Sequence, residues 1–304
     1  MQAFGEVKMM KIRKKRCISD RMFVFCVVFL AIIATTVTLY PFIYIFSASI
    51  SSPTAVNRGE VLLWPVGFSI AGYEKVIANN EIWMSYGNTI FYTVAGTFCS
   101  LIATAIGAYP LSRRQYCLRK PLNFLITFSM YFSGGLIPTY LIISRIGLYN
   151  NRWVMILPSL ISSYNLMVCR SAFSAIPEEI MESAQIDGAN DLRIFSGIAI
   201  HLITPTLAVL TLYYAVGKWN DFFTALLYLS KSKLVPLQVI LRRVLIMASN
   251  EMMNDASRGN PETMAVNLQV RYATIIVSTI PILFVYPFVQ RFFVKGVMLG
   301  AVKG

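Results

Sequence analysis

The sequence has few charged residues, and this scarcity sets its broad class. Charged residues make up 13% of the 304 residues, about half of the share found in a typical soluble domain. A soluble protein with 56% hydrophobic residues would expose apolar patches that promote aggregation. The composition therefore predicts a membrane protein and argues against a large soluble domain with an extensive core.

Cysteine and histidine are also too sparse, or too scattered, to support a metal site or a disulfide framework. None of the five cysteines belongs to a C-x-x-C pair, and three lie inside apolar runs, as small core residues do. His201 is the single histidine and lies far from any G-x-S-x-G turn, so a Ser-His-Asp triad is not indicated. We therefore predict no metal site and no catalytic residues.

A phosphate-binding loop is missing as well. The nearest match begins at Gly67 and ends at Gly72, and Tyr73 follows where the motif requires Lys and then Ser or Thr. Any ATP, with its magnesium ion, would have to be bound by another chain. The sequence thus predicts a protein that is not an enzyme and carries no cofactor of its own.

The net charge of the chain is +13, and seven of its 27 basic residues precede the first apolar run. A basic tail that adjoins a long apolar helix marks the cytoplasmic side of a membrane, so residues 1–21 are predicted to be cytoplasmic. The second loop on that side would contain Arg113, Arg114, Arg119 and Lys120. This distribution explains the basic charge without nucleic-acid binding.

Six apolar segments approach the roughly 20 residues that a membrane span requires. They are residues 22–47, 84–110, 122–143, 153–171, 204–229 and 272–293. The first could be a signal peptide, because Ser47-Ala48-Ser49 resembles a cleavage site. Its apolar run of about 25 residues exceeds the 7–15 of a signal peptide, which favours an uncleaved anchor.

These segments predict an all-α membrane protein with six transmembrane helices. The expected organisation is a cytoplasmic tail, an anchor helix, an extracytoplasmic segment, a core of five spans and a cytoplasmic carboxyl tail, at residues 1–21, 22–50, 51–83, 84–293 and 294–304. Residues 234–247 form an additional amphipathic pattern, with Gln238, Arg242 and Arg243 opposite the apolar side. This helix either lies at the outer surface or simply packs on its neighbours.

Residues 174–203 are too polar to span a membrane and read as a helix–turn–helix. Pro177 suits the start of the first helix, Gly188 suits the left-handed residue that ends it, and Asn190 can cap the second. Apolar residues recur on one face of each helix, namely Ile180, Met181 and Ala184 in the first and Leu192, Phe195 and Ala199 in the second. We expect a small rigid knob on the cytoplasmic face.

The same loop resembles the EAA loop of ABC importer permeases, whose pattern is E-A-A, three residues, Gly, nine residues and I-x-L-P. Glu182, Ala184, Gly188 and Ile198 match this pattern at the right spacing. Ser183 and Ile200 are mild changes, whereas His201 replaces the expected proline. Pro205 is expected to take over the start of the following helix.

Three further segments resemble the carbohydrate branch of these permeases. They are residues 131–140 (YFSGGLIPTY), 217–223 (GKWNDFF) and 293–304 (FVKGVMLGAVKG). They are most similar to permeases related to the smaller maltose-transporter subunit, in the group that handles complex oligosaccharides. The resemblance covers nearly the whole chain from residue 20.

This resemblance implies a type I importer permease in a bacterial inner membrane. Its partners would be a second permease subunit, two ATPase subunits and an extracytoplasmic solute-binding protein that delivers an oligosaccharide. A permease for an amino acid, a peptide or phosphate is the alternative, because those importers share the EAA loop. Coupling to the ATPase is then expected at Glu182, Ala184, Asp187 and Gly188.

The substrate pathway is expected around Trp219, Asn220, Asp221 and Phe222, well inside the fifth span. An ionisable residue in a span costs about 2.5–3.5 kcal/mol on insertion scales, so it usually faces a cavity or a partner. Lys218 and Asp221, three residues apart, could partly neutralise each other. Trp219 could stack on sugar C–H groups or pack between subunits, and Asn220 could bond to hydroxyls.

Two other classes of membrane protein fit the sequence less well. A secondary transporter would need an internal repeat or intramembrane ion ligands, and neither is present. A membrane-embedded enzyme would need paired carboxylates or histidine clusters inside its spans.

Overall fold

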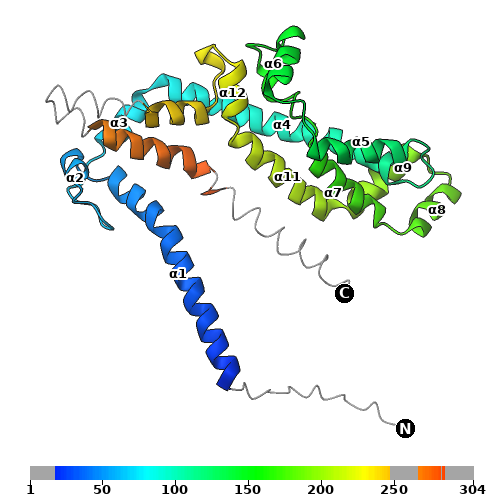
Figure 1. The fold of residues 1–304 in the computed structure, drawn as a ribbon, viewed down its shortest axis with the longest axis horizontal. Helices are drawn as coiled ribbons and strands as arrows, with labels where there is room; N and C mark the ends of the chain where they lie inside the picture. Colours follow the sequence, from blue (N-terminus) through cyan, green and yellow to red (C-terminus); the bar gives the residue numbers. More distant parts are fainter. Residues whose placement is uncertain (1–17, 247–265, 282, 285–304) are drawn as a thin grey trace.

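The computed structural model describes residues 18–246, 266–281 and 283–284, and this part of the chain is helical (Figure 1). Its extended pairing is limited to one isolated antiparallel bridge between Ser51 and Phe68. Among the described residues, two helices are long and apolar enough to cross a membrane alone, and there are up to four spans if each of two bent pairs counts as one. The predicted all-α class is confirmed.

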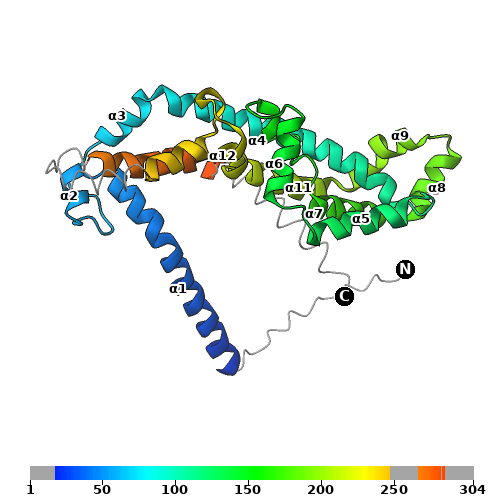
Figure 2. The ribbon, with the colours of Figure 1, turned by 45° about the horizontal axis from the view of Figure 1, so that its top comes forward.

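The first helix, α1 (Ile18–Ser49), extends away from the rest of the chain (Figures 1 and 2). It covers the predicted anchor, residues 22–50, apart from the last residue. Its most apolar stretch of 18 residues has no residue buried against other described residues, and only its carboxyl end, at Ser47, Ala48 and Ser49, is buried. An apolar helix without cover from its own chain is stable in lipid or against another subunit.

Two short helices, α2 (Pro53–Asn57) and α3 (Ala71–Ala78), follow α1. They lie beside the helical residues 266–281, which are about 200 residues further along the chain (Figure 1). Gln269 in those residues bonds to Gly72 of α3.

The fully buried side chain of Gln269 holds this region together. Its Nε2 donates to the carbonyl oxygens of Ser51 at 2.9 Å and Ser69 at 2.8 Å, and its Oε1 accepts from the Gly72 N–H at 3.1 Å. A Cβ at Gly72 would come within 3.0 Å of Gln269, so this contact requires glycine. Gln269 therefore joins the segment that follows α1 to the helical residues 266–281.

The centre of the molecule is α4 (Asn80–Ser112), which packs along α7 (Ser163–Ser174) and α11 (Thr204–Trp219). A Cβ at Gly96 would overlap the side chain of Lys218, so this glycine lets α11 approach α4 closely. We call these three helices the scaffold, because the segments described below pack against them.

The third expected span is not one continuous helix. Residues 122–143 fall in two helices, α5 (Arg119–Tyr131) and α6 (Leu136–Arg145), which are bent by 116° from each other. The bend is made at Gly134-Gly135, where Gly135 has a φ of +85° that other residues rarely adopt. The apolar composition concealed this break.

The fourth expected span, residues 153–171, is also interrupted. A 3₁₀ turn, η1 (Arg152–Met155), is separated from α7 by non-helical residues that include Pro158. At 1.5 Å per residue, the 12 residues of α7 cover about 18 Å, which is less than the roughly 30 Å of a bilayer core. This segment is therefore not a straight span.

The last two expected spans begin as helices. Residues 204–229 form α11 and α12 (Phe223–Tyr228), with a break between them. The sixth, residues 272–293, is helical as far as described, and its remainder lies outside the described residues together with the carboxyl tail at 294–304. The amino-terminal tail is described only from residue 18 onward.

The amphipathic segment is helical over residues 237–246. Leu237 and Ile240 are buried in a core that they share with Ile82 and Tyr92 of α4. Arg243 on its polar side binds Glu81, with Nη1 to Oε1 at 2.8 Å. Of the two interpretations, packing on neighbouring helices is the one that this arrangement supports.

Candidate coupling loop and translocation pathway

The first helix of the predicted helix–turn–helix is α8 (Glu178–Ile186), and Gly188 ends it as expected. Gly188 has a φ of +82°, and its N–H donates to the Gln185 carbonyl oxygen at 3.0 Å. The Ala189 N–H reaches back to the Ala184 carbonyl oxygen at 2.9 Å. This pair of bonds is the Schellman motif, in which a left-handed residue satisfies the last helical carbonyls.

The second helix begins where Asn190 was predicted to cap it. Asn190 Oδ1 accepts from the Arg193 N–H at 2.9 Å, and α9 (Asp191–Ile194) continues through a π-helical turn, Phe195–Ala199, into α10 (Ile200–Leu202). The chain then bends by 80° into α11, with Pro205 in the first turn of that helix. Pro205 therefore occupies the helix-starting position that was predicted for it.

The inner side of the knob is fixed to the scaffold by apolar packing. Met181, Ala184, Ile194 and Ala199 are buried in one core with residues of α4 and α7. Within it, Tyr109 contacts Phe173 and Phe195, with ring centroids 5.4 and 5.1 Å away. The inner side of the knob therefore packs directly on the scaffold helices.

Two residues of the predicted apolar faces are exposed. Leu192 is 76% exposed, because it lies two positions before the buried Ile194 and so about 200° around the helix from it. Ile180 is 40% exposed at the edge of the face centred on Met181. Sequence periodicity groups residues on a face but does not say which of them faces inward.

The outer side of the knob presents charged residues around apolar ones. Glu182, Asp187 and Gly188 are exposed, as coupling residues must be, and Ile186 is 86% exposed beside them. Ala184, the fourth predicted coupling residue, is buried in the core beneath this surface. Sequence reasoning missed Ile186 and Leu192 as apolar residues on the exposed surface.

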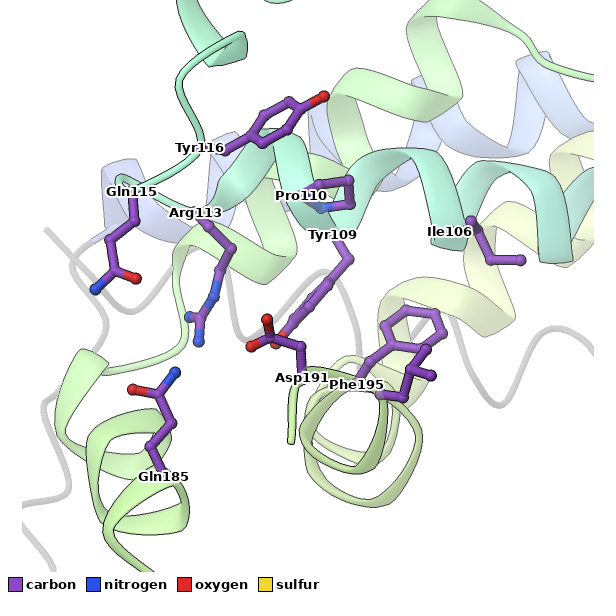
Figure 3. Close-up of a pocket in the computed structure, with 10 residues that line it drawn as sticks. Ile106, Tyr109, Pro110, Arg113, Gln115, Tyr116, Gln185, Asp191 and Phe195 are labelled. Carbon is purple, nitrogen blue, oxygen red and sulfur yellow. The ribbon is translucent and has the colours of Figure 1, made fainter. Parts of the chain in front are cut away.

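A cavity of about 540 Å³ separates the knob from the end of α4 (Figure 3). Arg113 and Gln185 approach each other across it, and Asp191 lies beside Tyr109. Next to it, Arg114 Nε lies 3.1 Å from Glu178 Oε1, and both side chains are exposed. The basic loop predicted from Arg113 and Arg114 therefore adjoins the knob directly.

The four predicted pathway residues lie at the far end of α11 from the knob, in a different setting from the one expected. Helix α11 ends at Trp219, and residues 220–222 form a break before α12. Asn220 and Asp221 are therefore not inside a continuous span. The Asp221 Oδ1 accepts from the Thr224 N–H at 3.1 Å, in the first turn of α12.

Trp219 is buried, with 8% of its surface exposed. Its indole contacts the Tyr86 ring edge-on at 6.2 Å. The ring therefore packs within the chain and presents no open face, whereas Asn220 and Phe222 are exposed. Asn220 Nδ2 donates to the Val216 carbonyl oxygen at 2.9 Å, which leaves part of its amide for another group.

Lys218 is also buried, and its ammonium group has polar partners. Nζ donates to Ser159 Oγ at 2.9 Å and contacts the Met155 carbonyl oxygen at 3.5 Å. The expected pairing with Asp221 is not among the ion pairs between described residues. Both residues instead line a cavity of about 300 Å³, whose other walls are Ser159, Ser162, Asn165, Tyr213, Tyr214 and Gly217.

The described residues thus place an exposed helix–turn–helix at one end of α11 and a polar break at the other. Residues 9–299 match the family of binding-protein-dependent transport system inner membrane components. The chain belongs to this family.

Known relatives agree with that assignment. The chain is 41% identical over 268 residues to the polygalacturonan/rhamnogalacturonan transport system permease protein YtcP of Bacillus subtilis, covering 88% of this chain and 93% of that one. It is 40% identical over 272 residues to the protein LplC of the same organism, covering 88% and 90% of the two chains. A solved chain from a bacterial ABC transporter that imports the acidic polysaccharide alginate is 39% identical, with a TM-score of 0.84 over 91% of this chain and 98% of that one.

Proposed function

We propose that this chain forms half of the translocation pathway of an ATP-driven importer, with a second permease subunit as the other half. The observation that carries the proposal is the knob itself. Its outer side exposes Glu182, Asp187 and Gly188, and its inner side is buried against α4 and α7. Such a knob can dock on an ATPase subunit and transmit the movement of that subunit to the scaffold helices.

The orientation follows from the knob and the basic residues near it. Docking on an ATPase places the knob in the cytoplasm, on the same side as Arg113 and Arg114. The amino-terminal tail, residues 1–21, and the carboxyl tail, residues 294–304, belong on that side by the excess of basic residues. The uncovered apolar surface of α1 is available to lipid and to the second permease.

The solute proposed for this importer is an acidic oligosaccharide. Galacturonan and alginate, named for two of the relatives, are both polymers of uronic acids, which carry a carboxylate on each sugar. The exposed Asn220 and Phe222 provide an amide for hydroxyls and a ring for sugar C–H groups. A solute-binding protein would deliver this solute, in preference to an amino acid, a peptide or phosphate.

Reversing the charge of Glu182 tests the docking surface. Glu182→Lys should leave the buried side of the knob intact, because Glu182 is exposed, and should weaken association with the ATPase subunits about threefold to tenfold. The measurement is the amount of ATPase that copurifies with the tagged permease, at low and at high salt. Glu179→Lys, a change of the same kind in the first turn of α8, is the control. Full copurification with Glu182→Lys would overturn the assignment of this surface.

A further inference from the structure

Two exposed segments meet at the end of α11 that is farthest from the knob. The guanidinium carbon of Arg242, in the helix over residues 237–246, lies 5.0 Å from the centroid of the Phe222 ring. One turn earlier in that helix, Gln238 Nε2 lies 3.5 Å from Asn220 Oδ1. An aromatic ring, an arginine and two amides are therefore gathered from positions about 20 residues apart.

The direction of Arg242 is fixed by the helix that carries it. Leu237 and Ile240 hold one side of that helix in the core, and Arg243 is paired with Glu81. Arg242 is exposed, and none of the ion pairs between described residues includes it. Its charge is thus held at one place by the Phe222 ring and remains available to an anion.

Nearby acidic groups do not compete for this arginine within the described part of the chain. Asp221 adjoins Phe222, but one of its oxygens is occupied by the Thr224 N–H. Glu81 is held by Arg243. Neither carboxylate forms an ion pair with Arg242 within the described residues, although Asp221 keeps its negative charge nearby.

These four groups match the parts of a sugar acid. A guanidinium binds a carboxylate through two parallel hydrogen bonds, and it does so while its plane rests on an aromatic ring. An aromatic face packs on sugar C–H groups, and amides both donate to and accept from hydroxyls. A neutral sugar would use the ring and the amides but would leave the arginine without a partner.

We propose that Arg242 and Phe222, with Asn220 and Gln238, form a subsite for the carboxylate of a uronic acid unit as it enters the pathway. Arg242 selects for charge, and the other three side chains bind the sugar ring. This inference rests on the proposed import of an acidic oligosaccharide and adds the group that recognises its acid function. It also gives a role to the amphipathic helix over residues 237–246.

The test is uptake by the complete importer, with both permeases, the ATPases and the solute-binding protein, reconstituted in proteoliposomes. Trigalacturonate is the acidic probe and its methyl ester is the neutral one. Arg242→Gln should lower uptake of the acid about tenfold, as expected for loss of a charge-assisted bidentate contact, and should change uptake of the ester less than about twofold. Uptake of the acid by Arg242→Lys should lie between that of the wild type and that of Arg242→Gln, because lysine keeps the charge but cannot form two parallel hydrogen bonds. Arg145→Gln, at the exposed end of α6, is the matched control.

Equal loss for both probes would show that Arg242 is structural, and an unchanged rate for the acid would show that it is not in the pathway; either result overturns the subsite. If the wild type transports only trigalacturonate, the dependence of uptake on ionic strength tests the subsite instead. Raising the ionic strength to about 0.5 M should then slow the wild type and not Arg242→Gln, and an equal salt effect in both overturns the subsite. If the wild type carries neither probe, the proposed solute class is at fault and the subsite falls with it.

Discussion

Replacing Gly188 with Asp should reduce transport about tenfold or more while the protein still accumulates in the membrane. Gly188 has a φ of +82°, a conformation that costs most residues with a Cβ about 1–2 kcal/mol of stability and costs aspartate less. No atom lies within 4 Å of the added Cβ, so the change alters the turn and its charge without forcing the core apart. The docking surface beside Asp187 would be distorted and made more acidic. Uptake per unit of membrane-inserted protein is the measurement.

Gly197 supplies the matched control for that change. It lies in the same loop, it is exposed, it has an ordinary φ, and a Cβ there also meets open space. Gly197→Asp should therefore retain most of the transport activity. Equal losses in the two variants would mean that added charge on the loop, and not the left-handed turn, causes the defect.

Replacing Trp219 with Ala should destabilise the protein by about 3–5 kcal/mol, the range for removing a large buried aromatic side chain. Trp219 is buried and contacts Tyr86, so the loss is one of packing. Asn220→Ala should be far milder, because it removes hydrogen bonds that contribute roughly 0.5–1.5 kcal/mol each, and it should impair uptake with assembly intact. Thermal unfolding and size exclusion of the detergent-solubilised complex, beside uptake, measure both effects.

Together the two variants distinguish a residue that stabilises the fold by packing from one that contacts the solute. If Trp219→Ala kept its thermal stability and lost only uptake, the indole would have to touch the solute, contrary to its burial. If Asn220→Ala caused the subunits to dissociate, Asn220 would belong to the interface between permeases. The second result would refute its place in the pathway.

Local chemistry made the knob predictable from the sequence. The end of α8 at Gly188 and the cap at Asn190 depend on hydrogen bonds within a few residues, and the structure shows both. The family could also be predicted from the sequence, because its motifs are short and follow one another in a fixed order along the chain. Such features need no knowledge of which helices pack together.

Features that depend on packing could not be predicted in the same way. From apolar composition we predicted one span over residues 122–143, and composition gives no sign of the turn at Gly135. The interior position of Trp219 depends on Tyr86, more than 100 residues away in sequence. The contact between Phe222 and Arg242 joins two segments whose patterns, taken separately, indicate only a polar break and an amphipathic helix.

The most direct test of the central claim is transport by defined components. Proteoliposomes that contain this chain, a second permease, the ATPase subunits and a solute-binding protein loaded with labelled trigalacturonate should accumulate the sugar only when ATP is supplied on the ATPase side. Omitting the ATPase should stop uptake, and the purified chain alone should hydrolyse no ATP. Uptake driven by an ion gradient without ATP, or robust ATP hydrolysis by this chain alone, would contradict the account.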